Sequence, residues 1–313
     1  MSMNVMKSFA KAAITGAFSL LPAAGRAAVT EKLLDDAPFN VLASLADKFH
    51  VVSLNVQGGY GVIEGSPADA SILGTYASTG RWASSTNALL IDFFSENNGG
   101  TYVDVGANIG LTTIPVAANA RVTCFAVEPD PTNYGHLERN VAMNCTNANV
   151  TTYPFAVFSR KSTLELERSS FNFGDHRLRL GCEPGRMQEH KRKTVTVEAE
   201  ALDSLIPPLT GPVAVKIDTQ GAEVFVIEGG SRTLASCDLL IVEFWPYGMA
   251  RLGADAESVV RFLESHFTSV ALSTEEHPVA AAMPIAEAAA RLRNMLATQA
   301  NSIDSYVDVI ARR

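Results

Sequence analysis

The sequence contains few charged residues and an unusually small share of basic ones. Only 19% of its 313 residues are charged, whereas 47% are hydrophobic, so the chain can bury a large core and is too apolar to be intrinsically disordered. The 25 basic residues are outnumbered by 33 acidic ones, and the formal net charge of −8 repels polyanions at long range. This argues against nucleic acid as a partner. The stretch at residues 190–193 (HKRK) is a local exception that we interpret as a solvated loop tip.

Cysteine is scarce and scattered. The four cysteines show neither a CxxC spacing nor neighbouring histidines at metal-ligand distances along the chain, and they are Cys124, Cys145, Cys182 and Cys237. This excludes a disulfide framework or a zinc site of the usual spacing. We therefore expect reduced thiols, no bound metal and a cytoplasmic protein.

Long hydrophobic runs are also missing. The apolar stretch at residues 12–21 follows Lys7 and Lys11, as in a secretory signal, but Thr15 and Gly16 interrupt it. It is much shorter than the roughly 20 residues that span a membrane. We predict no membrane span and interpret the stretch as an amphipathic packing helix.

Residues 1–75 have a mixed pattern that predicts an N-terminal helical cap. A helix is expected around residues 31–49, followed by a short extended piece at residues 50–55. Beyond it, the glycines at positions 58, 59, 61 and 65 are expected to interrupt any regular element. Another helix should end at Phe94, because residues 97–100 (NNGG) accept left-handed backbone conformations.

Residues 76–313 are predicted to form one α/β domain. Short apolar runs alternate with segments long enough for helices, which is typical of a mostly parallel sheet. Seven strands are expected, at residues 101–105, 122–127, 150–157, 213–218, 239–244, 267–272 and 306–310. An insertion at about residues 160–201 alternates with period two at both of its ends, which predicts an added β-hairpin.

The segment at residues 101–110 (TYVDVGANIG) is a predicted strand that ends in an acid and leads into a glycine-bearing turn. Ligands bind at the carboxyl ends of the strands in such sheets. Asp104 can accept hydrogen bonds from an ammonium group, and the backbone amides from Gly106 to Gly110 can bind a carboxylate. The amino acid end of S-adenosylmethionine presents both groups.

Glu128 follows the second predicted strand, 22 residues after Gly106, where a carboxylate can bind both hydroxyls of a ribose. Alternatively, Asp104 and Glu128 cap the helices that follow them. A nicotinamide-dependent oxidoreductase would use the same positions, but the turn has the pattern GxxxG instead of GxGxxG, and the preceding acid would repel a diphosphate. A non-catalytic binding module on the same fold is a further alternative.

Asp218 ends the fourth predicted strand and is the main candidate for a general base that removes the proton of an attacking hydroxyl group. Glu243 and Glu223 are alternatives. Glu223 is better interpreted as a helix N-terminal carboxylate, and pairing with Lys216 would also explain Glu243. The three acids could instead surround a divalent cation, which we consider the less favoured arrangement.

Aromatic residues and histidines occur in the insertion, which either lines an acceptor pocket or forms an exposed hairpin. They include Phe171, Phe173 and His176. The spacing of His136, His176 and His190 identifies no role, and we interpret them as surface residues.

Six segments in order resemble the FkbM-type methyltransferases, a family of S-adenosylmethionine-dependent enzymes. They are YVDVGANIG (102–110), FAVEPDP (125–131), FAVFS (155–159), LDSL (202–205), VKIDTQGAEVFVIEGG (215–230) and IVEFWP (241–246). The sequence departs from the family pattern at Thr219 and Gln220, because an acidic residue commonly precedes this glycine.

The resemblance implies a class I methyltransferase fold, with a Rossmann-like sheet of seven strands, the last antiparallel, and helices on both faces. It further implies in-line transfer of the methyl group of S-adenosylmethionine to a hydroxyl of a small molecule, such as a sugar, a glycolipid headgroup or a secondary metabolite. The implied cofactor residues are Asp104, Gly106, Ala107, Asn108 and Gly110 at the methionine end, Glu128 with Pro129 at the ribose, and Ala156 with Val157 at the adenine.

Overall fold

The computed structural model describes residues 39–48, 50–145, 149–181, 185–274 and 281–313, in two compact units, 1–51 and 52–313. The first unit contains helix α3 (Phe39–Lys48), which confirms the second half of the helix predicted at residues 31–49. The apolar stretch at residues 12–21 lies outside the described residues. None of the described helices is long and apolar enough to cross a membrane.

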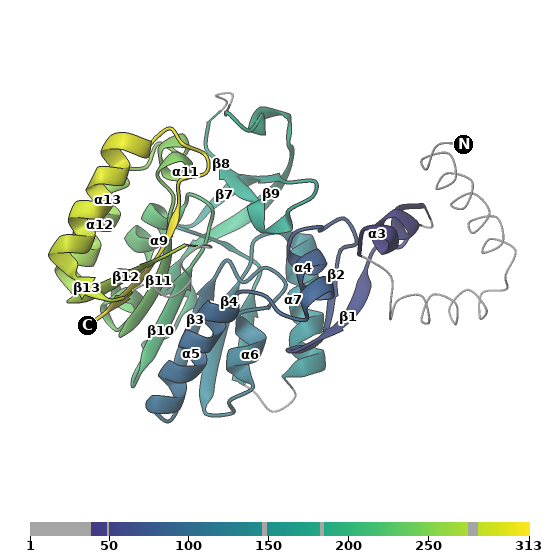
Figure 1. Ribbon diagram of the computed structural model, residues 1–313, viewed down its shortest axis with the longest axis horizontal. Helices are drawn as coiled ribbons and strands as arrows, with labels where there is room; N and C mark the ends of the chain where they lie inside the picture. The colour runs from purple at the N-terminus through teal and green to yellow at the C-terminus, as the bar shows by residue number, and fades with distance from the viewer. Residues whose placement is uncertain (1–38, 49, 146–148, 182–184, 275–280) are drawn as a thin grey trace, which may run out of the picture. The chain divides into compact units, whose positions relative to one another are not determined.

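The second unit is built on a large twisted sheet with the strand order β13-β12-β14-β11-β10-β3-β4-β5 (Figure 1). Its strands are β3 (Gly100–Val105), β4 (Val122–Val127), β5 (Asn149–Tyr153), β10 (Val213–Ile217), β11 (Leu239–Phe244), β12 (Ser269–Ser273), β13 (Met283–Pro284) and β14 (Val307–Arg312). The five strands from β11 to β5 run parallel, and β14 is antiparallel to both β11 and β12. The class I methyltransferase topology, with its antiparallel last strand, is therefore confirmed, and β13 adds a two-residue edge strand.

The predicted bounds of one strand were wrong. The run at residues 150–157 is divided at Pro154 into β5 and a separate strand, β6 (Ala156–Phe158). Proline lacks the backbone N–H that a continuous ladder requires. The chain leaves the main sheet here, and β6 pairs instead with β9 (Lys193–Ala201) of the insertion.

Helices cover both faces of the main sheet. One face packs against α5 (Ser84–Glu96) and α6 (Thr113–Ala117) through a cluster that includes Phe94, Tyr102 and Ala214. The other face packs against α9 (Glu223–Gly229), α12 (Glu257–His266) and α13 (Ile285–Gln299). Along β10, Val213, Val215 and Ile217 face this second layer, as period-two alternation requires. The remaining helices are α4 (Ile72–Thr79), α7 (Pro131–Asn144), α8 (Leu202–Leu205), α10 (Ser231–Ala235) and α11 (Pro246–Arg251).

The glycines at positions 58, 61 and 65 do not interrupt regular structure, contrary to expectation. They lie at the ends of a β-hairpin formed by β1 (Leu54–Gly58) and β2 (Gly61–Gly65), where Gly61 has a φ of +104°. The hairpin is bound to α7, because Asn140 Nδ2 donates to the carbonyl of Glu64 (2.9 Å) and Asn144 Nδ2 to that of Val62 (2.8 Å). Residues 52–75, which the sequence pattern assigned to the N-terminal cap, therefore belong to the same compact unit as the main sheet.

The predicted hairpin in the insertion is confirmed and extended. β7 (Ser162–Arg168) pairs antiparallel with β9, and β8 (Arg177–Arg179) adds a third strand next to β7. Together with β6 they form a second sheet of order β6-β9-β7-β8, and two short 3-10 turns, η1 (Phe173–Asp175) and η2 (Glu189–Lys191), lie between the strands. Among the described cysteines, Cys124 and Cys237 are buried, and Cys145 is partly buried and also has a free thiol; Cys182 lies outside the described residues.

Candidate active site

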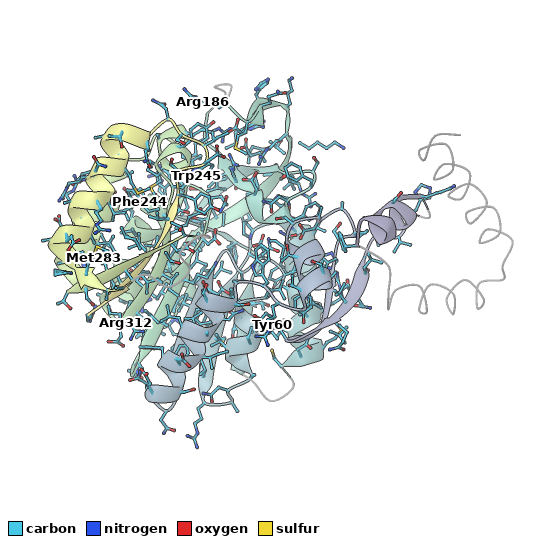
Figure 2. The ribbon with its side chains drawn as sticks, viewed as in Figure 1. Tyr60, Arg186, Phe244, Trp245, Met283 and Arg312 are labelled. Atoms are coloured by element: carbon cyan, nitrogen blue, oxygen red, sulfur yellow. The ribbon has the colours of Figure 1, made fainter. Side chains whose placement is uncertain are left out.

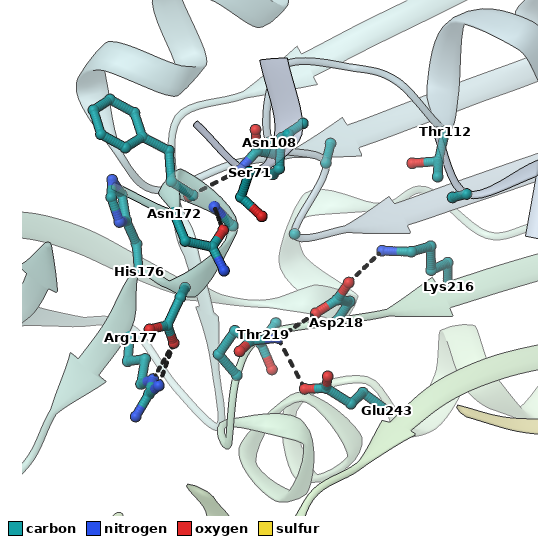
Figure 3. A pocket seen from close by; sticks show the side chains of 18 of the residues that line it. Ser71, Asn108, Thr112, Asn172, His176, Arg177, Lys216, Asp218, Thr219 and Glu243 are labelled. Atoms are coloured by element: carbon teal, nitrogen blue, oxygen red, sulfur yellow. Dashed lines mark hydrogen bonds and ion pairs between the residues drawn. The ribbon is translucent and has the colours of Figure 1, made fainter. Parts of the chain in front are cut away.

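A cavity of about 780 Å³ opens at the carboxyl ends of β3, β4, β10 and β11. It is lined by nine of the eleven predicted site residues, namely Gly106, Ala107, Asn108, Glu128, Pro129, Ala156, Val157, Asp218 and Glu243. Asp104 and Gly110 are not among the lining residues. Figure 3 shows part of this cavity, with Asn108 in the turn after β3, Asp218 directly after β10 and Glu243 on β11.

The turn after β3 contains three residues with positive φ, Gly106 (+86°), Asn108 (+52°) and Gly110 (+95°). A Cβ on Gly106 would lie 1.9 Å from the backbone carbonyl oxygen of Asp218. Glycine is therefore needed here to let the ends of β3 and β10 approach each other. At Gly110 a Cβ would lie 3.0 Å from Leu137 Cδ1, so this glycine lets the turn pack against α7.

Asp104 is fully buried beneath the turn. Its Oδ2 accepts hydrogen bonds from the hydroxyls of Thr112 (2.6 Å) and Thr113 (2.7 Å). Its Oδ1 has no hydrogen-bond partner among the described residues and lies 3.9 Å from Lys216 Nζ. Asp104 binds hydroxyl groups at the start of α6 and accepts no backbone hydrogen bond there, so simple helix capping does not describe it. Its contact with the ammonium group of the cofactor stays a prediction.

Glu128 lies at the end of β4 with both carboxylate oxygens bound to backbone amides. Oε2 accepts from Asn108 N (2.9 Å) and Oε1 from Asp130 N (2.9 Å). Burial, aided by the nearby Asp130, raises the pKa of Glu128 to about 8 against the opposing effect of these hydrogen bonds. The residue that caps α7 is Asp130, whose side chain accepts from the amides of Thr132 and Asn133.

The other half of the cavity contains a chain of polar contacts (Figure 3). Lys216 Nζ lies 3.1 Å from Asp218 Oδ2, and Gln220 Nε2 donates to Asp218 Oδ1 (2.9 Å) and to Glu243 Oε2 (2.9 Å). Lys216 thus forms its short ion pair with Asp218, and not with Glu243, the pairing that the sequence analysis kept open as an alternative. The side chain of Asp218 is 39% exposed.

The pKa values of two groups in this half shift strongly. Burial raises the pKa of Glu243 well above its usual value, and the nearby carboxylates of Asp218, Glu223 and Asp308 raise it further. Burial opposes the charged form of Lys216, but Asp218 and Asp104 outweigh it and raise the pKa of this lysine. These shifts favour the charged form of Lys216 and the protonated form of Glu243.

Glu223 has the structural surroundings expected for a helix N-terminal carboxylate. It is the first residue of α9, is fully buried, and its Oε1 accepts from Thr219 N (3.0 Å) and Gly221 N (3.2 Å). It is absent from the cavity lining. Within the described ranges, no group of three or more histidine, cysteine, aspartate or glutamate residues is arranged to hold a metal ion.

The insertion lines the cavity through Phe171, Phe173 and His176. The carbonyl of Phe173 accepts from Asn108 Nδ2 (3.0 Å) and Asn133 Nδ2 (3.2 Å), which ties the insertion to the turn after β3 and to α7. Of the histidines expected at the surface, only His190 is exposed. His176 is buried, which lowers its pKa to about 4 and keeps it neutral, and His136 is buried beside Glu64.

Several lining residues were not predicted from sequence, among them Trp82, Trp245, Tyr306 and Asp308. Asp308 is opposite Glu243 in the β11–β14 register, which follows only once the antiparallel position of β14 is known. The Arg177 guanidinium lies 4.5 Å from the centre of the Trp245 ring and is paired with Asp175. Trp245, labelled in Figure 2, directly follows β11, and only this proximity to the strand end signalled it.

Comparison with known proteins gave one family match. The model of the methyltransferase FkbM domain matches residues 104–268, more than half of the chain. No curated protein matches the chain.

Solved structures that are similar to this chain have low sequence identity. A precorrin-6y C5,15-methyltransferase from Geobacter metallireducens is 12% identical over 72% of this chain and 88% of its own, with a TM-score of 0.37. A putative transferase from Pyrococcus horikoshii is 12% identical over 90% and 83%, with a TM-score of 0.39. A putative tRNA (m1A22) methyltransferase from Streptococcus pneumoniae is 12% identical over 72% and 68%, with a TM-score of 0.36. At these scores the assignment depends on the family match alone.

Proposed function

Because the chain belongs to the FkbM methyltransferase family and is an S-adenosylmethionine-dependent methyltransferase, we propose that it methylates a hydroxyl group of a small molecule. Candidate acceptors are a sugar, a glycolipid headgroup or a secondary metabolite. The observation that carries the proposal is that Asp218 faces the same cavity as the turn after β3 and as Glu128. In this proposal the base and the cofactor site share one cavity.

The residues in the first half of the cavity fit S-adenosylmethionine. Ala156 and Val157 offer an apolar wall to an adenine, and Glu128 lies at the strand end where a carboxylate can bind ribose hydroxyls. The Oδ1 of buried Asp104, which accepts no hydrogen bond from the described residues, is a further acceptor beneath the turn. When bound, the cofactor supplies an activated methyl group on its sulfonium.

Asp218 is the carboxylate best placed to take the proton of an attacking hydroxyl. Its side chain is partly exposed, and its ion pair with Lys216 leaves a carboxylate available as proton acceptor. Glu243 is the weaker candidate, because burial and the neighbouring carboxylates raise its pKa and so disfavour the ionised form that a base needs. Holding the acceptor oxygen about 3 to 3.5 Å from the methyl carbon would further accelerate the reaction.

The charges of the cavity support a small acceptor without phosphate groups. Its lining includes the acids Glu128, Asp218, Glu243 and Asp308. The lining cations Lys216 and Arg177 both form ion pairs, with Asp218 and Asp175. Neither cation is therefore free to bind a phosphate group, and the net charge of −8 repels a polyanion at long range.

The test is Asp218→Asn, measured by S-adenosylhomocysteine release with a panel of hydroxylated glycosides and polyketides. The amide keeps the size of the side chain but cannot accept the proton, so kcat should fall by roughly 10²- to 10⁴-fold. The affinity for S-adenosylmethionine, measured by calorimetry, should change little. Asp92→Asn, an exposed site on α5, is the matched control and should behave as wild type.

Two results would contradict the proposal. Retained turnover in Asp218→Asn would place the base elsewhere, with Glu243 the next residue to test. RNA binding that weakens steeply with salt would instead indicate a nucleic-acid acceptor.

A further inference from the structure

The turn at residues 219–221 joins β10 to α9 and is fixed from both sides. Glu223 Oε1 binds the amides of Thr219 and Gly221. A Cβ on Gly221 would lie 2.6 Å from the carbonyl carbon of Gly248, so the turn packs directly on the backbone of α11. Gln220, which lies between Thr219 and Gly221 in this turn, has a φ of +56°. This conformation is uncommon for glutamine and persists only when the surrounding structure determines it.

The amide of Gln220 contacts two carboxyl groups at once. Its Nε2 is 2.9 Å from Asp218 Oδ1 and 2.9 Å from Glu243 Oε2. An amide nitrogen has two hydrogens, and here each one is directed to a carboxyl oxygen. The second oxygen of Asp218 is bound by Lys216 at 3.1 Å. The carboxylate of Asp218 is therefore held at both of its oxygens.

We propose that Gln220 is a positioning residue for methyl transfer, which holds Asp218 and Glu243 in place with a neutral double donor. This inference rests on the proposed function, in which Asp218 accepts the proton of the acceptor. An amide donates both of its hydrogens without ionising. It therefore bridges Asp218 and Glu243 without adding a charge, and the two carboxyl groups need not share a proton. Gln220 thereby fixes the direction from which Asp218 meets the acceptor hydroxyl.

A carboxylate at position 220 would have the opposite effect. When ionised it has no hydrogen to donate, so the hydrogen bond to the Asp218 carboxylate would be lost, and a negative charge would be added beside Asp218 and Glu243. The groups that act on Glu243 are already mostly acidic, because Asp218, Glu223 and Asp308 raise its pKa after burial and only Lys216 lowers it. A further negative charge raises the pKa of neighbouring carboxyl groups.

The test is Gln220→Glu, with two readouts that a purely structural role would not move. The first is the titration midpoint of the Glu243 carboxyl, followed by carbon-13 NMR in protein labelled at its acidic side chains and assigned with Glu243→Gln. It should rise by about one pH unit or more. The second is the acidic limb of the kcat profile, which should move to higher pH while the affinity for S-adenosylmethionine stays nearly unchanged.

Gln188→Glu is the matched control. Gln188 has the same φ of +56° but is exposed on the insertion and is not among the cavity-lining residues, so neither readout should change. If Gln220→Glu does not fold, Gln220→Met is the alternative variant. It keeps the length of the side chain and removes both hydrogen-bond donors, so the acidic limb of the kcat profile should again move to higher pH.

An unchanged Glu243 midpoint in folded Gln220→Glu would overturn the inference. The failure of the proposed function has a different signature, because Asp218→Asn would then keep its rate. The NMR midpoint needs no acceptor and so still tests the contacts of Gln220 in that case.

Discussion

Glu128 lies in the half of the cavity that we propose for the cofactor, and its pKa is raised. Burial raises its pKa to about 8 in the folded protein, whereas an unfolded chain has a glutamate pKa of about 4.3. The folded state therefore binds this proton more tightly. The resulting stability is fully present below the unfolded pKa and is lost as the pH rises toward about 8.

Glu128→Gln should consequently flatten the decline in the free energy of unfolding between about pH 5 and pH 8. The measurement is urea denaturation at a series of pH values. Glu228→Gln, at an exposed site on α9, should keep the wild-type slope. An identical slope in Glu128→Gln and wild type would show that Glu128 titrates normally.

At the level of elements, the close approach of β3 and β10 depends on Gly106. Its φ is +86°, and a Cβ would strike the Asp218 carbonyl oxygen. Gly211 has a similar φ of +80°, but nothing lies within 4 Å of its hypothetical Cβ. Comparing substitutions at the two glycines therefore separates the cost of the left-handed backbone from the cost of the steric collision.

We expect Gly211→Ala to cost about 1–2 kcal/mol of stability, from the left-handed backbone alone. Gly106→Ala should cost about 1–3 kcal/mol more, because the added methyl group must displace the end of β10. Both values can be measured by urea denaturation. Equal losses in the two variants would mean that the strand ends adjust to the added group without cost.

The strands of the main sheet were predictable because they are short apolar runs between helices, and β4 and β11 match their predicted bounds. Gly106 and Glu128, which we propose bind the cofactor, were predicted to line the site from their positions at strand ends, and both line the cavity. The second sheet was only partly predictable, because Pro154 redirects β6 to a partner more than 40 residues later in the chain. Long-range pairing of this kind leaves no local sequence pattern. For the same reason, Asp308 could not be predicted as a residue of the cavity.

In the molecule as a whole, the cavity has two halves that come from different strands. The turn after β3, Glu128 and β6 form the half assigned to the cofactor, and β10, β11 and β14 form the half with Asp218 and Glu243. The insertion connects to the first half through the Phe173 carbonyl. The insertion also lines the cavity through Phe171, Phe173 and His176, so variation in it can change this lining without altering the sheet that holds the acids.

The central claim is that these halves form one active site, and a crystal structure with S-adenosylhomocysteine tests it most directly. The account predicts the adenine against Ala156 and Val157, the ribose hydroxyls at Glu128, and the sulfur facing Asp218 with room for an acceptor oxygen between them. A ligand bound elsewhere, or one whose sulfur points away from Asp218, would contradict it.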